Sequence, residues 1–205
     1  MPDVRALAAT DFPGVVEVHM EAFPASALSQ LGAEGVRRYY DWQMKNAPEC
    51  VALGVFPNQA LRGFCFAGVF HGALSGFLAR NKTFLVWRVI SHPQLLAGRL
   101  FRDRLALACR LLTGRGGPAP SVPGLPDRSF GILAIAVSPR EQGTGIGKLL
   151  MEECEHEARN RGYRAMHLSV SPANAIAIAF YERLGWQRRP ATDGKWYGLM
   201  TKALR

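Results

Sequence analysis

The chain has 205 residues, 48% of them hydrophobic and 20% charged, a balance typical of a folded protein with a sizeable apolar core. This composition excludes a disordered or low-complexity chain. The formal net charge of +9 favours an anionic ligand, nucleic acid or an acidic membrane surface, without choosing among them.

The cysteines and the N-terminus favour a cytoplasmic location. Cys50, Cys65, Cys109 and Cys154 show no CxxC spacing, so we expect reduced thiols and neither a metal site nor a disulfide framework. The N-terminal "MPDVRALAATDF" has no basic region followed by an apolar run, so no signal peptide is expected. No apolar run approaches the length of a membrane-spanning helix.

The first 70 residues alternate between strand and helix patterns. Residues 4–9 predict a short strand, and a helix is expected to follow with Pro13 in its first turn. A second helix is predicted over 31–45 from apolar residues at helical spacing. Two apolar runs at 50–56 and 61–70 flank "PNQA", which predicts a β-hairpin.

Residues 71–129 differ in composition and predict an insertion. The apolar, arginine-rich part includes a predicted helix over 94–113, and a Gly/Pro-rich loop follows at 113–129. Arg104 falls inside the apolar arc of this helix. Three alternatives stay open: a helix packed on the domain with Arg104 reaching its rim, a lid whose Arg104 binds an anionic substrate, or a basic amphipathic helix at a membrane surface or homodimer interface.

The last third predicts a regular alternation of strands and helices. The expected elements are a buried strand at 130–137, a helix from the glycine loop to about 160, a strand at 165–170, a helix at 174–185 and a strand at 195–204. This order predicts an α/β or α+β sheet domain over 1–205 that contains the 71–129 insertion.

The stretch "PREQGTGIGKLLMEE" (139–153) resembles a phosphate-binding loop. A P-loop would need glycine at Gln142 and a hydroxyl at Leu149, and the G-x-G-x-G spacing departs from the dinucleotide fingerprint. What remains is a strand that turns through small residues into a helix, whose free N–H groups and dipole favour an anion.

Two motifs together resemble the GNAT N-acetyltransferase superfamily. Gln142, Gly145 and Gly147 match its Q/R-x-x-G-x-G/A signature. The block "NAIAIAFYERLGW" (174–186) matches a second family motif, which includes Asn174 and Tyr181. The resemblance covers roughly 130–187 and implies a mixed, mostly antiparallel twisted sheet with splayed fourth and fifth strands, flanked by helices.

The resemblance implies that acetyl-CoA is the co-substrate, with no metal. Its pyrophosphate would lie on the loop backbone, and its pantetheine arm along the edge of the strand at 130–137. The implied cofactor-binding residues are Ile135, Ala136, Val137, Gln142, Gly143, Thr144, Gly145, Ile146, Gly147, Lys148, Asn174 and Tyr181.

The resemblance also implies catalytic roles. The backbone N–H of Val137 would stabilise the oxyanion that forms at the thioester carbonyl, and Tyr181 would give a proton to the leaving thiolate. The alternative for Tyr181 is a core aromatic beside Phe180.

No carboxylate stands where the family places a base. Ser169 occupies the matching position of the fifth strand, and His167 lies two residues earlier on the same strand face, so His167 is the candidate base. Glu21 and His71 are further candidates near the acceptor site, and a water chain is an equal alternative.

We therefore predict a cytoplasmic N-acetyltransferase that acts on a primary amine, with a small molecule such as an amino sugar as the first candidate acceptor. A protein N-terminus or lysine is the second, and a non-catalytic acyl-CoA sensor is the alternative from another class. No nucleic-acid partner is expected, because no basic stripe with interleaved aromatic residues is evident.

Overall fold

The computed structural model describes residues 3–47, 49–70, 73–98, 101–103, 105–106 and 129–204. Seven strands form one sheet in the order β1-β2-β3-β4-β5-β7-β6. All neighbouring strands are antiparallel except β4 and β5, which are parallel. The strands are β1 (Asp3–Ala6), β2 (Val51–Phe56), β3 (Gly63–Gly68), β4 (Phe130–Val137), β5 (Ala165–Ser169), β6 (Gln187–Arg188) and β7 (Leu199–Ala203).

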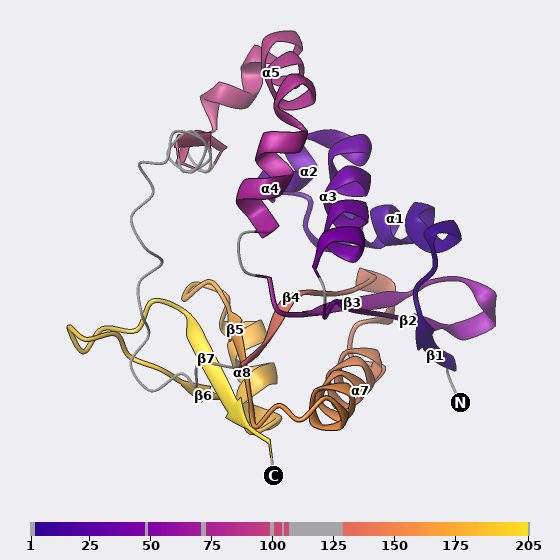
Figure 1. Ribbon diagram of the computed structural model, residues 1–205, viewed down its shortest axis with the longest axis vertical. Helices are drawn as coiled ribbons and strands as arrows, with labels where there is room; N and C mark the ends of the chain where they lie inside the picture. Colours follow the sequence, from indigo (N-terminus) through magenta and orange to yellow (C-terminus); the bar gives the residue numbers. More distant parts are fainter. Residues whose placement is uncertain are drawn as a thin grey trace.

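Helices cover both faces of this sheet (Figure 1). The helices on one side are α1 (Phe12–Ala22), α2 (Ala27–Gln30), α3 (Gly32–Asn46), α4 (Ala73–Arg80) and α5 (Lys82–Ser91). The helices on the other side are α7 (Ile146–Asn160) and α8 (Ala175–Arg183). The predicted α/β class and the mixed, mostly antiparallel sheet are thus confirmed.

Two apolar clusters fill the layers between the helices and the sheet. The alternation of side chains along each strand sends Leu53 and Cys65 towards α7, and Phe64 and Phe66 towards α1 and α3. Tyr40 of α3 packs against both phenylalanine rings and is fully buried. The sheet is therefore a rigid support between two cores.

Most predicted elements are confirmed, and several are shorter than predicted. The first strand ends at Ala6, because the Asp11 carboxylate accepts the Ala8 N–H at 2.8 Å and a 3₁₀ turn begins at Ala9. The last strand starts only at Leu199, after Gly198 with φ +99°. These ends follow local hydrogen bonds and turns that a hydrophobic pattern does not record.

The prediction of one continuous helix over 94–113 is wrong at its start. Residues Pro93–Ala97 form a 3₁₀ helix, and Gly98 then adopts an extended backbone. Helical backbone returns at 101–103 and 105–106, where Phe101 is buried. The remainder of the prediction, from 107 onwards, lies outside the described residues.

Candidate functional site

The strand β4 has an open edge over its second half. β3 pairs with β4 as far as Gly63↔Val137, whereas the parallel pairing with β5 ends at Ile132↔Leu168. From Leu133 to Val137, no described strand lies on the β5 side of β4. The splayed strands therefore offer unpaired backbone groups to an extended ligand.

The backbone of Val137 points to this open edge. Ser138 donates its backbone N–H to the Arg62 carbonyl on the β3 side at 2.8 Å. Because successive N–H groups of a strand point to opposite edges, the N–H groups of Val137 and Ile135 face the open side. The Gln142 amide donates to the Val137 carbonyl at 3.4 Å, in agreement with this direction.

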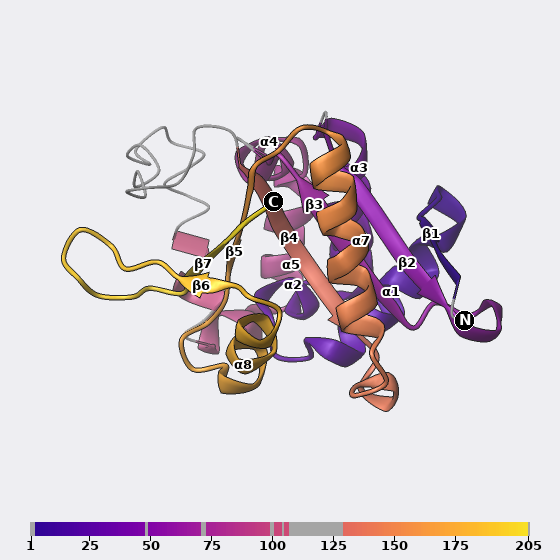
Figure 2. The same ribbon diagram turned by 90° about the horizontal axis from the view of Figure 1, so that it is seen from below.

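The glycine loop lies between the end of β4 and the start of α7, which are adjacent in Figure 2. Gly143 and Gly145 have φ of +83° and +94°, and a Cβ on either residue would meet no atom within 4 Å. These glycines are therefore needed for their backbone conformation, and the space beside them is open. The first N–H groups of α7 lack helical acceptors and can bind an anion there.

Gly147 has a different role, which is close packing. A Cβ on Gly147 would lie 3.3 Å from the Phe180 ring and 3.8 Å from the Val137 side chain. β4, α7 and α8 thus meet at one point, with Phe180 beside Tyr181. Among the other loop residues, Ile146 is buried in the core, whereas Lys148 is exposed with its Nζ 3.7 Å from Glu152.

Tyr181 is buried on α8 with only 8% of its surface exposed, between the rings of Phe180 and Trp186. Its hydroxyl makes no hydrogen bond with any residue that the structure describes. Burial raises the pKa of Tyr181, and the nearby Cys65 adds to the rise. The phenol therefore keeps its proton at neutral pH and can donate it.

Asn174 has a structural role in addition to the predicted one. It is the N-cap of α8, where its side-chain oxygen accepts the Ala177 N–H at 3.1 Å. This cap fixes the start of the helix that carries Tyr181, seven residues further on.

The structure does not bring His167 and Val137 together. His167 pairs with Gly131 at the start of β4, six residues before Val137, which corresponds to about 20 Å along a strand. Its Nδ1 lies 2.9 Å from the Ser129 hydroxyl, and a Cβ on Gly131 would be 2.8 Å from its Nε2. The ring thus lies near the point where β4 and β5 separate, and the role of base stays a prediction.

Glu21 is the carboxylate that the structure brings beside the end of β4. Its Oε2 accepts a hydrogen bond from the buried Ser138 hydroxyl at 2.7 Å, although the two residues are 117 positions apart. Sequence reasoning named Glu21 but missed Ser138, because no local pattern records a contact between α1 and β4.

The remaining candidates are less informative. Ser169 is exposed at the end of β5, where it pairs with Leu199. His71 and Arg104 lie outside the described residues. Within the described ranges, no three His, Cys, Asp or Glu side chains gather in a way that could hold a metal ion. None of the described helices is long and apolar enough to cross a membrane.

Comparison with known proteins supports this geometry. Residues 112–186 match the model of the acetyltransferase (GNAT) family. The [ribosomal protein bS18]-alanine N-acetyltransferase of Escherichia coli K12 is 43% identical over 71 residues, which are 31% of this chain and 48% of that protein. The mycothiol acetyltransferase of Rhodococcus opacus is 40% identical over 57 residues, or 28% of this chain and 19% of that protein.

Solved structures share the fold over nearly the whole chain. The crystal structure of the ribosomal-protein-S18-alanine N-acetyltransferase from Escherichia coli has a TM-score of 0.57 at 19% identity, covering 100% of this chain and 94% of that one. PaiA N-acetyltransferase from Thermoplasma acidophilum, in complex with coenzyme A, has a TM-score of 0.59 at 15% identity, with 99% of both chains covered.

Residues 112–186 thus resemble the GNAT acetyltransferase family, and the described chain shares the fold of solved N-acetyltransferases. The chain spans about half the length of the bS18-alanine relative that it matches. The family-model match at 112–186 includes β4, the glycine loop and Tyr181, whereas α1 to α5 lie before it.

Proposed function

We propose that this protein is an acyl-CoA-dependent N-acetyltransferase that moves an acetyl group from acetyl-CoA to a primary amine. The observation that carries this proposal is the open edge of β4 at Leu133–Val137, next to the glycine loop and to the helix that carries Tyr181. A family match over 112–186 and a coenzyme A complex among the structures of similar fold support it.

The residues present fit the co-substrate in two places. The open space at Gly143 and Gly145 leaves room for a pyrophosphate near the first N–H groups of α7. The N–H groups of Ile135 and Val137 face the edge along which a pantetheine arm would pair. Acetyl-CoA would supply the activated acetyl thioester.

The chain's own groups would then do the following. The backbone N–H at Val137, or at Ile135 two residues earlier, would stabilise negative charge on a carbonyl oxygen. Tyr181, which is protonated at neutral pH, would give its proton to the departing sulfur. The proton of the attacking amine would leave through Glu21, His167 or water.

A small-molecule amine is our first candidate for the acceptor, and a protein N-terminus or lysine is the second. The relatives named as bS18-alanine N-acetyltransferases favour a protein acceptor. The mycothiol acetyltransferase, whose sequence identity to this chain is similar, is named for a different acceptor. Among the described residues, we expect the acceptor to bind near Glu21 of α1 and Ser138, which follows the last residue of β4.

The test is acceptor-dependent thiol release from acetyl-CoA, measured over a panel of amines that includes amino sugars and short peptides. For Tyr181→Phe we expect about a hundredfold lower kcat with acetyl-CoA affinity retained, because only the proton donor is lost. Tyr163→Phe is the matched control: Tyr163 is also buried, but it contacts Phe130 at the opposite end of β4 and its hydroxyl bonds Glu49.

Tight acetyl-CoA binding without thiol release on any amine would support the sensor alternative. A Tyr181→Phe variant as active as the wild type would remove Tyr181 from the mechanism while leaving the transferase intact. Loss in both tyrosine variants would point to a folding effect.

A further inference from the structure

Helix α5 presents an apolar face that no described element covers. The side chains of Val86, Trp87 and Ile90 are 59%, 60% and 73% exposed. They recur at the i, i+1 and i+4 positions of one helix face, and Lys82, four residues before Val86, lies on the same face. Isolated exposed apolar residues are ordinary, but three large ones on one turn of a helix are not.

The opposite face of α5 holds the helix in place. The Arg38 guanidinium of α3 lies 4.7 Å from the centre of the Phe84 ring. Arg88 reaches Gly32 so closely that a Cβ there would be 2.8 Å from its Nη2. The exposed face therefore points outward, and Figure 1 shows α5 at the end of the molecule farthest from the sheet.

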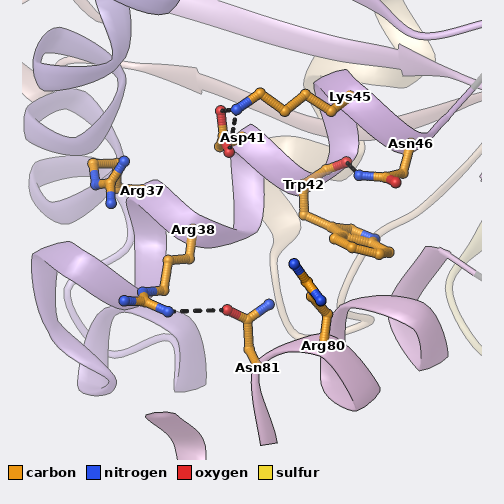
Figure 3. A pocket seen from close by; sticks show the side chains of 8 residues that line it. All are labelled: Arg37, Arg38, Asp41, Trp42, Lys45, Asn46, Arg80 and Asn81. Carbon is orange, nitrogen blue, oxygen red and sulfur yellow. Dashed lines mark hydrogen bonds and ion pairs between the residues drawn. The ribbon is translucent and has the colours of Figure 1, made fainter. Parts of the chain in front are cut away.

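The charge around this helix is positive. The sequence has no Asp or Glu between Glu49 and Asp103, a stretch that includes α4 and α5. A groove of about 540 Å³ adjoins the first turn of α5, and Figure 3 shows its basic residues around Trp42. Its cations are Arg37, Arg38, Lys45 and Arg80.

Carboxylates neutralise only part of this groove. Glu34 pairs with both Arg37 and Arg38, and Asp41 pairs with Lys45. Arg80 makes no ion pair with any described residue, so four cations against two carboxylates leave two positive charges. The part of the molecule around α5 thus carries a net positive charge, and Lys82 lies on the apolar face itself.

We propose that α5 binds the surface of an anionic phospholipid bilayer. Val86, Trp87 and Ile90 would enter the boundary between headgroups and acyl chains, while Lys82 would face lipid phosphates. With ten residues, α5 is about 15 Å long and too short to span the apolar core of a bilayer, so it would lie along the interface.

A second copy of the chain is the less favourable occupant of this face. A two-fold contact centred on α5 would bring Lys82 of both copies close together. The stretch between Glu49 and Asp103 offers no carboxylate to pair with them. Anionic lipids meet both the apolar and the basic requirement. The proposal does not rest on acetyl transfer.

The sequence suggested a membrane contact over 94–113, whereas our proposal places the contact on α5. Within that range the structure places Phe101 in the core and leaves Leu96 only 39% exposed. Among the described residues of the 71–129 region, the large apolar side chains with the highest exposed fractions lie earlier, on α5.

The experiment is co-sedimentation of the full chain with vesicles of phosphatidylglycerol and phosphatidylcholine in equal parts, and with phosphatidylcholine alone. Ile90→Ser should lower binding to the anionic vesicles about tenfold, because one large apolar side chain no longer enters the interface. Ile176→Ser is the matched control, since Ile176 of α8 is 85% exposed but distant in sequence from this face. Binding of the wild type should weaken with salt.

A second readout places the contact on α5. Vesicles with brominated acyl chains should quench the fluorescence of Trp87, and Trp87→Phe should lose most of this quenching while it keeps most of the binding. Absence of binding to anionic vesicles would overturn the proposal, as would equal losses of binding for Ile90→Ser and Ile176→Ser. Self-association that Ile90→Ser abolishes, in a protein that does not bind vesicles, would show instead that this face contacts a second copy.

Discussion

At the scale of single residues, His19 shows how burial changes the chemistry of a side chain. It lies on the sheet-facing side of α1, only 5% exposed, with its Nδ1 2.9 Å from the Tyr40 hydroxyl. Removal from water lowers its pKa from 6.5 to about 4. His19 is therefore neutral in the folded protein at all but acidic pH.

We expect His19 to make the protein less stable as the pH falls from about 6.5 to about 4. In this window the unfolded chain binds a proton that the folded chain does not, so protons favour unfolding. The loss should reach about 3 kcal/mol, measured as the free energy of unfolding in urea at a series of pH values. In His19→Gln this part of the pH dependence should disappear.

Tyr40→Phe is the control for this prediction. It removes the hydrogen bond to Nδ1 but leaves His19 buried, so the pH dependence should persist. If Tyr40→Phe flattened the curve as much as His19→Gln, the hydrogen bond rather than desolvation would be the cause.

At this scale the sequence predicts residues whose role depends on their neighbours along the chain. Gly143 and Gly145 could be recognised because a strand-to-helix turn needs positive φ. The contact between Glu21 and Ser138 could not, because it joins residues 117 positions apart. The placement of His167 near Gly131 likewise depended on the pairing of β4 with β5.

At the scale of elements, α7 has glycines with positive φ at both ends. Gly145 precedes its first residue with φ +94°, and Gly162 follows its last turn with φ +78°. A Cβ would meet no atom within 4 Å at either position. The two positions therefore share their backbone requirement but differ in surroundings, because only Gly145 is next to the open edge of β4.

This pair allows a controlled substitution. Gly145→Ala and Gly162→Ala should each lower the free energy of unfolding by about 1 kcal/mol, because both force a side chain into the left-handed region. Only Gly145→Ala should weaken acetyl-CoA binding, measured by calorimetry, since it disturbs the N–H groups at the start of α7. Equal affinities in the two variants would contradict the assignment of the loop.

Elements with a continuous pattern and clear end signals were predicted with accurate bounds. "FGILAIAV" is a buried apolar run bounded by Ser138 and Pro139, and it forms β4 over the same residues. The helix predicted over 94–113 had a periodic pattern but contains Gly98, which costs a helix about 1 kcal/mol relative to alanine. Its backbone there is extended.

At the scale of the whole molecule, Glu155 joins α7 to the strand β7. Its carboxylate is 5% exposed and lies 2.6 Å from the Lys202 Nζ and 3.4 Å from Arg159. β7 lies two strands beyond β4 in the sheet, whereas α7 packs against β2, β3 and β4. The ion pair therefore connects the C-terminal half of the sheet to the helix that covers its central strands.

Glu155→Gln should lower the free energy of unfolding by about 2 kcal/mol, because it leaves the partly buried Lys202 without its carboxylate. Lys148 and Glu152, an exposed pair on the same helix, provide the comparison: Glu152→Gln should cost less than about 0.5 kcal/mol. Urea unfolding of both variants measures the difference, and similar costs would show that burial does not strengthen the Glu155 contact.

The order of the strands was not available from local patterns. The sequence predicted the class of sheet, and the resemblance implied the splayed strands, but the position of β7 between β5 and β6 depends on pairs such as His167↔Thr201 and Gln187↔Thr201. Such contacts are decided by packing between distant segments.

The position of β7 between β5 and β6 has a consequence for the order in which the protein can fold during synthesis. Of the described strands, β7 is the last to leave the ribosome, yet both β5 and β6 need it as a partner. Until it emerges, β5 has only three register pairs with β4 and an exposed edge on its other side. We therefore expect the half of the molecule that carries Tyr181 to stay open to aggregation, and to chaperones, until late in translation.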